Sequence, residues 1–285
     1  MKRLSCLLFS FSAFLLAELL LPQQALAWGP GAHMVAGNWI LQNLTVLSGA
    51  AAEALMHYPG QFLYGSLSAD IFIGKGSKAK KGHSHNWESG FALLTKAENL
   101  PKQAYAYGYL AHLAADTVAH NVFVPGLLHT APGSGRLAHV YLESQADRLL
   151  SWDSADALGV FREETAMLCM SMRQKTLPFL FKSMLFQRSI AVGGSAVWRN
   201  SLKTLEHFRP EGERSVLLER MLVLSARAMV DVLQKGAASP VLGLDPVGSN
   251  ALALAGKVKD RQWTSAGLRV TIPPVLENIP PTCTL

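Results

Sequence analysis

Residues 109–121 read YLAHLAADTVAHN, an apolar stretch of helical character that carries His112, Asp116 and His120 at steps of four. Because each such step turns an α-helix by about 400°, the three side chains drift only about 80° around the axis and share one face. Burying two imidazoles and a carboxylate is costly unless charges or hydrogen bonds compensate. A metal ion commonly compensates a group of His and Asp side chains, so the stretch predicts a metal site on a buried helix.

Residues 1–27 have the pattern of a secretory signal peptide. A basic start, MKR, precedes a long apolar run, and the small-residue motif ALA ends at Ala27. A retained membrane anchor is the alternative, but the apolar run contains Glu18 and is followed by a cleavage motif. We therefore expect cleavage near Ala27, and a secreted or periplasmic protein that begins at Trp28.

Composition narrows the functional classes. The chain has 285 residues, a formal net charge of +6 and 49% hydrophobic residues, which suits one globular domain with a small appendage. The positive charge is scattered, so it does not indicate nucleic acid, although it modestly favours anionic membrane surfaces. Only Cys169 and Cys283 follow the leader, which allows one disulfide but no thiolate metal site. After Trp28, no apolar stretch reaches the roughly 18 residues that span a bilayer.

The periodicity of apolar residues is helical rather than strand-like along most of the chain. We therefore expect an all-α fold, a single multi-helix domain over residues 28–236 with the metal cluster at the centre of the helix bundle. Residues 237–285 are richer in Gly and Pro and predict an irregular C-terminal tail, extended or partly disordered. The expected helices lie near residues 32–56, 90–120, 136–150, 155–190, 196–208 and 213–235.

Further ligand candidates begin at the new N-terminus. Cleavage after Ala27 would give Trp28 a free α-amino group with a pKa of roughly 7.7 to 8, which can lose its proton to a metal at neutral pH. The Trp28 carbonyl lies where it could close a chelate ring. A Gly-Pro-Gly turn then leads to His33 at the start of the first expected helix.

Two later segments add further ligand candidates. Asp70 is a carboxylate at the edge of an apolar segment, and the motif HSH places His83 and His85 two residues apart. In an extended chain these two histidines point to opposite sides, so we expect one ligand and favour His85, which lies near the apolar Trp87. The choice between His83 and His85 is left open.

A second helical pair follows in HVYLESQAD, where His139 and Glu143 are four residues apart and face one way. Together the candidates are nitrogen and oxygen donors, which suits zinc, and they are too many for one tetrahedral ion. We expect two or three zinc ions, with a carboxylate such as Asp116 bridging. The remaining histidines, His57, His129 and His207, lie outside the pattern.

In their order along the chain, these residues resemble the zinc-dependent phospholipase C family, secreted bacterial enzymes with three zinc ions and a fold shared with S1 and P1 type nucleases. The resemblance implies one zinc held by Trp28, His33 and Asp116, another by Asp70, His85, His112 and Asp116, and a third by His120, His139 and Glu143. One difference is that the family usually has a longer gap between the helix Asp and the next His, whereas here DTVAH keeps a single helical step.

The resemblance also implies a function. It predicts metal-assisted hydrolysis of a phosphodiester, with Asp70 orienting or deprotonating the attacking water. A glycerophospholipid substrate at a membrane surface would give diacylglycerol and a phosphorylated headgroup. The alternatives are an S1/P1-type nuclease, which would act on single-stranded nucleic acid, and a zinc-binding protein without catalytic activity.

Overall fold

The computed structural model describes residues 28–72, 85–131, 135–161, 177–204, 211–259 and 270–280. Over these residues the chain is all-α and contains no strand, which confirms the predicted fold class. The expected signal peptide, His83, Cys169 and Cys283 lie outside the described residues. None of the described helices combines the length and apolar character needed to cross a bilayer.

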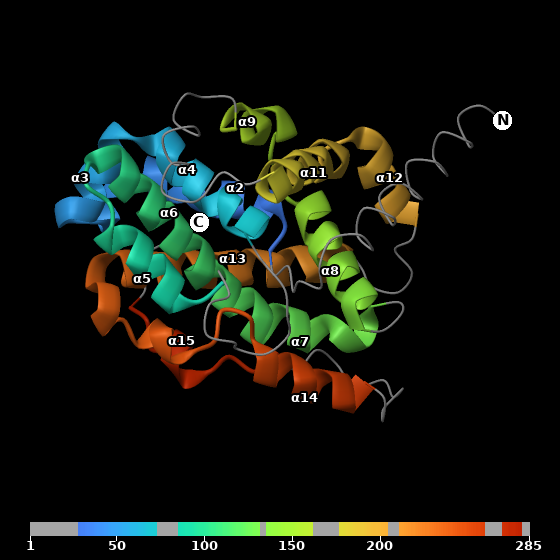
Figure 1. Ribbon diagram of the computed structural model, residues 1–285. Helices are drawn as coiled ribbons and strands as arrows, with labels where there is room; N and C mark the ends of the chain where they lie inside the picture. Colours follow the sequence, from blue (N-terminus) through green and yellow to red (C-terminus); the bar gives the residue numbers. More distant parts are fainter. Residues whose placement is uncertain are drawn as a thin grey trace.

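The N-terminal half of the chain forms a series of short helices around one long helix (Figure 1). These elements are α2 (Pro30–Gln42), η1 (Leu44–Val46), α3 (Gly49–His57), α4 (Pro59–Ser68), η2 (Ala69–Phe72), α5 (Trp87–Thr95), α6 (Leu100–Val118), η3 (Ala119–Phe123), α7 (Val124–Leu127), η4 (Leu128–Thr130) and α8 (Gly135–Leu149). The C-terminal half adds α9 (Ser154–Gly159), α11 (Leu177–Gly193), α12 (Ala196–Thr204), α13 (Glu211–Lys235), η5 (Gly236–Ala238), η6 (Pro240–Gly243), α14 (Ser249–Lys259) and α15 (Pro274–Glu277).

Helix α6 is the centre of the bundle. It contacts α2, α3, α4, α5 and α13, and α13 crosses the middle of the molecule in Figure 1. Asn99 starts α6, because its side-chain oxygen accepts a hydrogen bond from the Lys102 N–H at 3.1 Å. From Ala104 onward nearly every side chain of α6 is buried, and many are Ala or Gly, so neighbouring helices can approach it closely from several directions.

Two glycines bring the backbones of α4 and α6 into contact. A Cβ atom on Gly65 would lie 2.1 Å from the Tyr105 carbonyl oxygen, and one on Gly108 would lie 2.0 Å from the Phe62 carbonyl oxygen. Neither position therefore has room for a side chain. This close crossing places the end of α4, and the η2 turn that follows it, directly beside α6.

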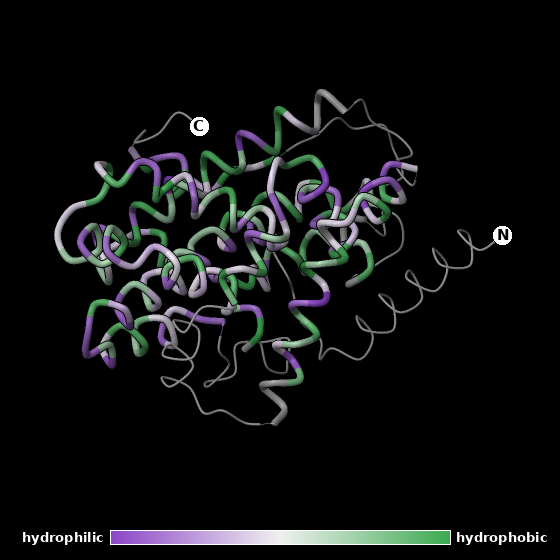
Figure 2. The backbone as a smooth tube through the Cα atoms, turned by 90° about the horizontal axis from the view of Figure 1, so that it is seen from above, coloured by the Kyte–Doolittle hydropathy of each residue, from purple (hydrophilic) through white to green (hydrophobic). Residues whose placement is uncertain are grey.

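Three expected helices are each divided in the structure, and one of them, near 155–190, contains α9, which ends at Gly159, and α11, which begins at Leu177. The segment 32–56 forms α2 and α3, because the chain turns between Asn43 and Ser48 and then passes through Gly49 with a φ of 63°. The segment 90–120 divides at Asn99 and Pro101, which begin α6. Helix α4 lies in PGQFLYGSLS, for which no helix is predicted. Hydrophilic and hydrophobic stretches alternate along most helices, as expected for helices with one buried face (Figure 2).

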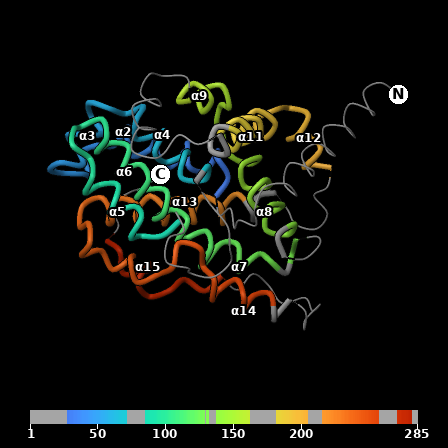
Figure 3. The backbone as a smooth tube through the Cα atoms, viewed as in Figure 1, coloured from blue at the N-terminus to red at the C-terminus, as the bar shows by residue number. Residues whose placement is uncertain are grey.

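In the described part of the C-terminal tail, residues 237–259 and 270–280, the chain forms η5, η6, α14 and α15, joined by short irregular connections. Helix α14 is not predicted from the composition of the tail, and it packs against α7, η3 and η4. Figure 3 shows α14 and α15 on the side of the molecule away from α9 and α11. The tail therefore contacts the segment that follows α6, and the boundary at residue 236 stays a prediction.

We predict that Gly108→Ala lowers the free energy of unfolding by about 1–3 kcal/mol, because the added methyl group would overlap the Phe62 carbonyl and push α4 from α6. Chemical denaturation of the metal-loaded protein measures this change. Gly256→Ala in α14 is the control, because no atom lies within 4 Å of a Cβ there. It should leave stability unchanged or raise it by up to about 1 kcal/mol. Equal stability of Gly108→Ala and the wild type would contradict the close crossing.

Candidate metal centre

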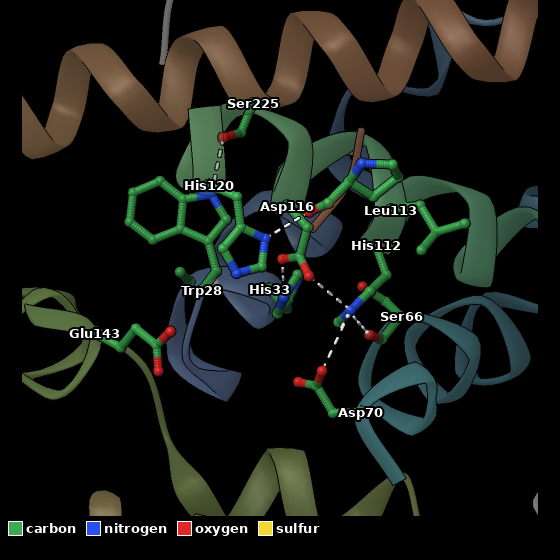
Figure 4. A network of polar contacts seen from close by, with 12 residues as sticks. Trp28, His33, Ser66, Asp70, His112, Leu113, Asp116, His120, Glu143 and Ser225 are labelled. Carbon is green, nitrogen blue, oxygen red and sulfur yellow. Dashed lines mark hydrogen bonds and ion pairs between the residues drawn. The ribbon is translucent and has the colours of Figure 1, made fainter. Parts of the chain in front are cut away.

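Five buried side chains from four parts of the chain meet at the centre of the bundle. His112 and Asp116 lie one turn apart on α6, and His33 lies in the first turn of α2. Asp70 is in η2, directly after α4, and His85 immediately precedes the N-cap of α5. Figure 4 shows His33 and His112 pointing toward the Asp116 carboxylate, with Asp70 beyond His112.

The Asp116 carboxylate contacts three imidazoles. Its Oδ2 lies 2.5 Å from His85 Nε2 and 3.2 Å from His112 Nε2, and its Oδ1 lies 3.2 Å from His33 Nε2. The His33 and His112 rings stack with centroids 4.0 Å apart, and His112 Nε2 is 3.4 Å from Asp70 Oδ1. One donor atom from each of Asp70, His85, His112 and Asp116 lies within 4.8 Å of the others. One metal ion can contact donors at this spacing.

Several of these donor atoms have no hydrogen bond among the described residues. They are His33 Nε2, His112 Nε2, Asp70 Oδ1 and Asp116 Oδ1, and all are buried. They face one another at 3.2 to 3.4 Å as close pairs of imidazole nitrogen and carboxylate oxygen, without the geometry of a hydrogen bond. A cluster of such atoms that face one another therefore indicates a bound cation, and a set of imidazole nitrogens and carboxylate oxygens fits zinc.

Backbone carbonyls orient two of the histidines. His112 Nδ1 donates a hydrogen bond to the Ser66 carbonyl oxygen at 2.7 Å, and His120 Nδ1 donates to the Pro246 carbonyl oxygen at 2.5 Å. Because a carbonyl oxygen only accepts, each Nδ1 must carry the hydrogen, which leaves Nε2 as the atom that faces the site. This is the usual arrangement for a histidine that binds a metal.

A second group of candidate residues lies beside the first. His139 Nε2 is 2.9 Å from Glu143 Oε1 one turn further along α8. The His120 ring meets the His139 ring edge-on, with centroids 5.2 Å apart. The structure therefore brings together the three residues that the resemblance assigns to a third zinc. Figure 4 shows Glu143 on the opposite side of His33 from Asp70.

The uniform α-helical spacing expected from His112 to His120 ends at Val118. Residues Ala119–Phe123 form a π-helical turn, which is wider than an α-helical turn. Pro125 explains the change, because its ring would clash with the Asn121 carbonyl in a regular α-helix and it has no N–H to donate. His112 and Asp116 share one face as predicted and contact each other, whereas His120 lies in the π turn and its ring packs against His139.

Trp28 is anchored at the edge of the cluster. Its indole Nε1 donates a hydrogen bond to Ser225 Oγ on α13 at 3.1 Å, and its ring packs on Phe123 with centroids 4.7 Å apart. The side chain is almost fully buried, and Figure 4 shows it beside His120. Sequence reasoning missed Ser225, whose only signal is a hydroxyl within the apolar stripe of α13.

Asp147 holds the turn between Trp28 and His33. Its two carboxylate oxygens accept hydrogen bonds from the backbone N–H groups of Gly31 and Ala32 at 2.9 and 3.0 Å. Both N–H groups belong to the first turn of α2, and the Ala32 N–H also donates to the Gly29 carbonyl oxygen at 3.1 Å. A residue of α8 therefore caps α2 from a distance of more than 100 positions in sequence. Sequence reasoning missed this role, although Asp147 continues the four-residue spacing of His139 and Glu143.

Burial and neighbouring charges shift the pKa values of three residues of the cluster when no metal is bound. Burial alone would lower the pKa of His112, but the carboxylates of Asp116 and Asp70 outweigh it and raise this pKa to about 10. Burial opposes ionisation of Asp116, but His112 and the other imidazoles hold its pKa well below the usual value. Burial, with the charge of His112, lowers the pKa of His33. The proton therefore resides on His112.

The pKa of the cap residue Asp147 is shifted in the opposite direction from that of Asp116. Burial raises the pKa of its carboxyl to about 7, although the N–H groups of Gly31 and Ala32 and the charge of Arg199 act to lower it. Asp147 is thus a buried group whose charge depends on its two backbone donors. Loss of either donor would leave the carboxylate poorly compensated.

Comparison with known proteins bears on the same residues. Residues 32–174, half of the chain, match the family described as zinc dependent phospholipase C. This stretch contains both groups of candidate ligands, except for Trp28. No curated protein and no solved structure was found that matches the chain.

We predict that zinc affinity falls about tenfold for each pH unit between pH 8 and pH 6. His112, with a pKa of about 10, is protonated over this whole range in the metal-free protein, and zinc must displace its proton. Titration calorimetry in buffers of different ionisation enthalpy should detect the released proton at pH 7. Replacing the exposed His57 by Ala is the control and should change neither quantity. An affinity independent of pH would contradict the assignment of the proton to His112.

We predict that Asp147→Ala lowers the free energy of unfolding by about 1–3 kcal/mol and weakens zinc binding about 10- to 100-fold, because the turn that leads to His33 loses its cap. Denaturation and competition with a chelator measure the two effects. Asp153→Ala is the matched control, since Asp153 caps the exposed start of α9 through the Ala155 N–H at 2.7 Å. It should cost about 1 kcal/mol without changing zinc affinity. If Asp147→Ala binds zinc as tightly as the wild type, the cap on α2 does not support the zinc site.

Proposed function

The chain belongs to the zinc-dependent phospholipase C family, and from this premise we propose that it hydrolyses the phosphodiester bond of glycerophospholipids at a membrane surface. The products are diacylglycerol and a phosphorylated headgroup. The observation that carries the proposal is the buried group of Asp70, His85, His112 and Asp116, whose donor atoms lie within 4.8 Å of one another. All four residues lie inside the part of the chain that matches the family.

The proposed cofactor is zinc, as two or three ions. The central ion would be held by Asp70, His85, His112 and the bridging Asp116, whose contacts with one another support the assignment. The proposed ligands of the other two ions are Trp28, His33 and Asp116 for one, and His120, His139 and Glu143 for the other. Support for this last set is the contact of His139 with both His120 and Glu143.

Bound zinc polarises phosphoryl oxygens and lowers the pKa of water enough to supply a nucleophile at neutral pH. The residues of the chain supply orientation and proton transfer. We assign Asp70 the role of orienting or deprotonating the attacking water, because its Oδ1 is buried, has no hydrogen bond among the described residues, and lies at the edge of the group beside His112. Ser66, through its carbonyl, keeps Nε2 of His112 directed toward Asp70.

Secretion is part of the proposal. Removal of residues 1–27 would make Trp28 the N-terminal residue and provide its α-amino group and carbonyl as ligands. The anchoring of the Trp28 indole by Ser225, and of the next turn by Asp147, supports this role. Both contacts would hold a new N-terminus beside His120 and His33 without help from the leader.

The proposal predicts that protein beginning at Trp28 contains two or three zinc ions and hydrolyses phosphatidylcholine, and that a chelator removes the activity. Asp70→Asn should lower kcat by about 100-fold or more, because the carboxylate that accepts the proton is lost. Metal analysis and release of phosphorylated headgroup measure these effects. Glu98→Gln removes an exposed carboxylate that pairs only with Lys102 among the described residues, and should act like the wild type.

Single-stranded DNA is assayed in the same samples. Zinc-dependent cleavage of DNA without lipid hydrolysis would replace the proposal by an S1/P1-type nuclease. Bound zinc with neither activity would point to a protein that binds metal without turnover. Absence of bound metal would contradict the proposal and also the interpretation of Asp70, His85, His112 and Asp116 as a metal site.

A further inference from the structure

Exposed apolar side chains are concentrated on three helices that contact one another. Seven large apolar side chains are strongly exposed among the described residues. Four of them lie on α8, α11 and α12, and each of these helices packs against the other two. They are Leu137 on α8, Phe181 and Met184 on α11, and Val197 on α12, with exposed fractions of 57%, 56%, 49% and 54%. The remaining three lie on α3, α13 and α14.

The orientation of α11 is fixed by its buried side. Ile190 is fully buried, and Phe186 packs edge-on against Phe161 with ring centroids 6.0 Å apart. At about 100° per residue, Phe181 and Met184 lie on the opposite side of the helix from Phe186 and Ile190. The two exposed side chains are therefore held outward by the packing of the helix, rather than exposed at a frayed end.

The charge of the same segment has one sign. Residues 177–204, which form α11, α12 and their connection, contain Lys182, Arg188, Arg199 and Lys203 and no acidic residue, although the chain has 20 of them. Arg199 is engaged inside the molecule, because its guanidinium donates to the carbonyl oxygens of Arg148 and Leu150. Of the other three, Lys182 and Arg188 lie on α11, as do Phe181 and Met184, and Lys203 lies on α12, as does Val197. Exposed apolar groups flanked by basic residues complement an anionic lipid surface.

The position of these helices connects this face with the metal centre. Helix α11 packs against η2, the turn that carries Asp70, and α8 carries His139 and Glu143. Figure 1 shows α8, α11 and α12 together at one end of the molecule. Helix α11 therefore separates this exposed face from η2 and α8, the elements that carry residues of both groups of candidate ligands.

We propose that Leu137, Phe181, Met184 and Val197, together with Lys182 and Arg188, form the face through which the protein binds an anionic bilayer. We call this set the α11 face. Phe181 and Met184 enter the boundary between headgroups and acyl chains, and the two basic residues contact lipid phosphates. The inference rests on the proposed function, because the α11 face would bring the protein to the membrane that contains its proposed substrate. Binding itself requires no hydrolysis.

The test separates binding from turnover. Binding is measured by rapid sedimentation of the zinc-loaded protein in the cold with vesicles of phosphatidylcholine that contain phosphatidylglycerol, before hydrolysis becomes appreciable. The test variants below are compared with the wild type in the same way. Turnover is measured on a short-chain phosphatidylcholine below its micellar concentration. Phe181→Ser with Met184→Ser is expected to weaken vesicle binding about tenfold or more and to leave hydrolysis of the monomeric lipid unchanged.

Two further variants sharpen the result. Leu254→Ser changes a 65% exposed side chain on α14 and should alter neither measurement. Lys182→Gln with Arg188→Gln should weaken binding to anionic vesicles, reduce its dependence on salt, and leave binding to pure phosphatidylcholine unchanged. This variant retains every apolar side chain of α11, so it tests the face even if the first variant does not fold.

Wild-type vesicle binding in both the Phe181/Met184 and the Lys182/Arg188 variants would overturn the inference, whatever the activity. A dimer that the Phe181/Met184 change dissociates, without lipid binding by either form, would overturn it in favour of a second copy of the chain. Loss of vesicle binding in the variants would support it even if no lipid is hydrolysed. In that case the α11 face stands and the proposed function fails, so the two failures are distinguishable.

Discussion

The carboxylate of Asp116, buried on the central helix, is the interaction on which the arrangement of the molecule depends. A charge without contact to water is stable only when the protein surrounds it with compensating groups. Here three imidazoles provide that compensation, and they come from α2, from the residue before the N-cap of α5, and from α6 itself. The elements that pack on α6 are thus held by an electrostatic centre as well as by apolar contact.

The groups that orient the candidate ligands lie far from them in sequence. The Pro246 carbonyl, which orients His120, is 126 residues away, and Ser225 lies 197 residues from Trp28. Asp147 caps the turn before His33 from the last turn of α8, and the Ser66 carbonyl reaches His112 because Gly65 and Gly108 allow α4 to touch α6. Distant parts of the chain thus orient the candidate ligands through two backbone carbonyls, one hydroxyl and one helix cap.

Sequence reasoning predicts those features that depend on local spacing. The all-α fold and the family are confirmed, and the four-residue steps of His112 with Asp116 and of His139 with Glu143 do bring those side chains together. The structure also places His85 against Asp116, although the assignment of ligands and of the leader stays a prediction. The π turn was missed despite Pro125, because a proline predicts a disturbance of the helix without specifying its form. Partners such as Pro246 cannot be predicted from local patterns, since tertiary folding alone brings them close.

The hydrogen bond between His120 and the Pro246 carbonyl joins a proposed ligand to a part of the chain that is translated much later. Synthesis runs from the N-terminus, so every proposed ligand, from Trp28 to Glu143, leaves the ribosome before Ser225 and Pro246. A nascent chain that ends before α13 contains the complete ligand set but lacks the hydroxyl that anchors Trp28 and the carbonyl that orients His120. The candidate metal centre can therefore reach its final geometry only after the chain has been translated as far as Pro246.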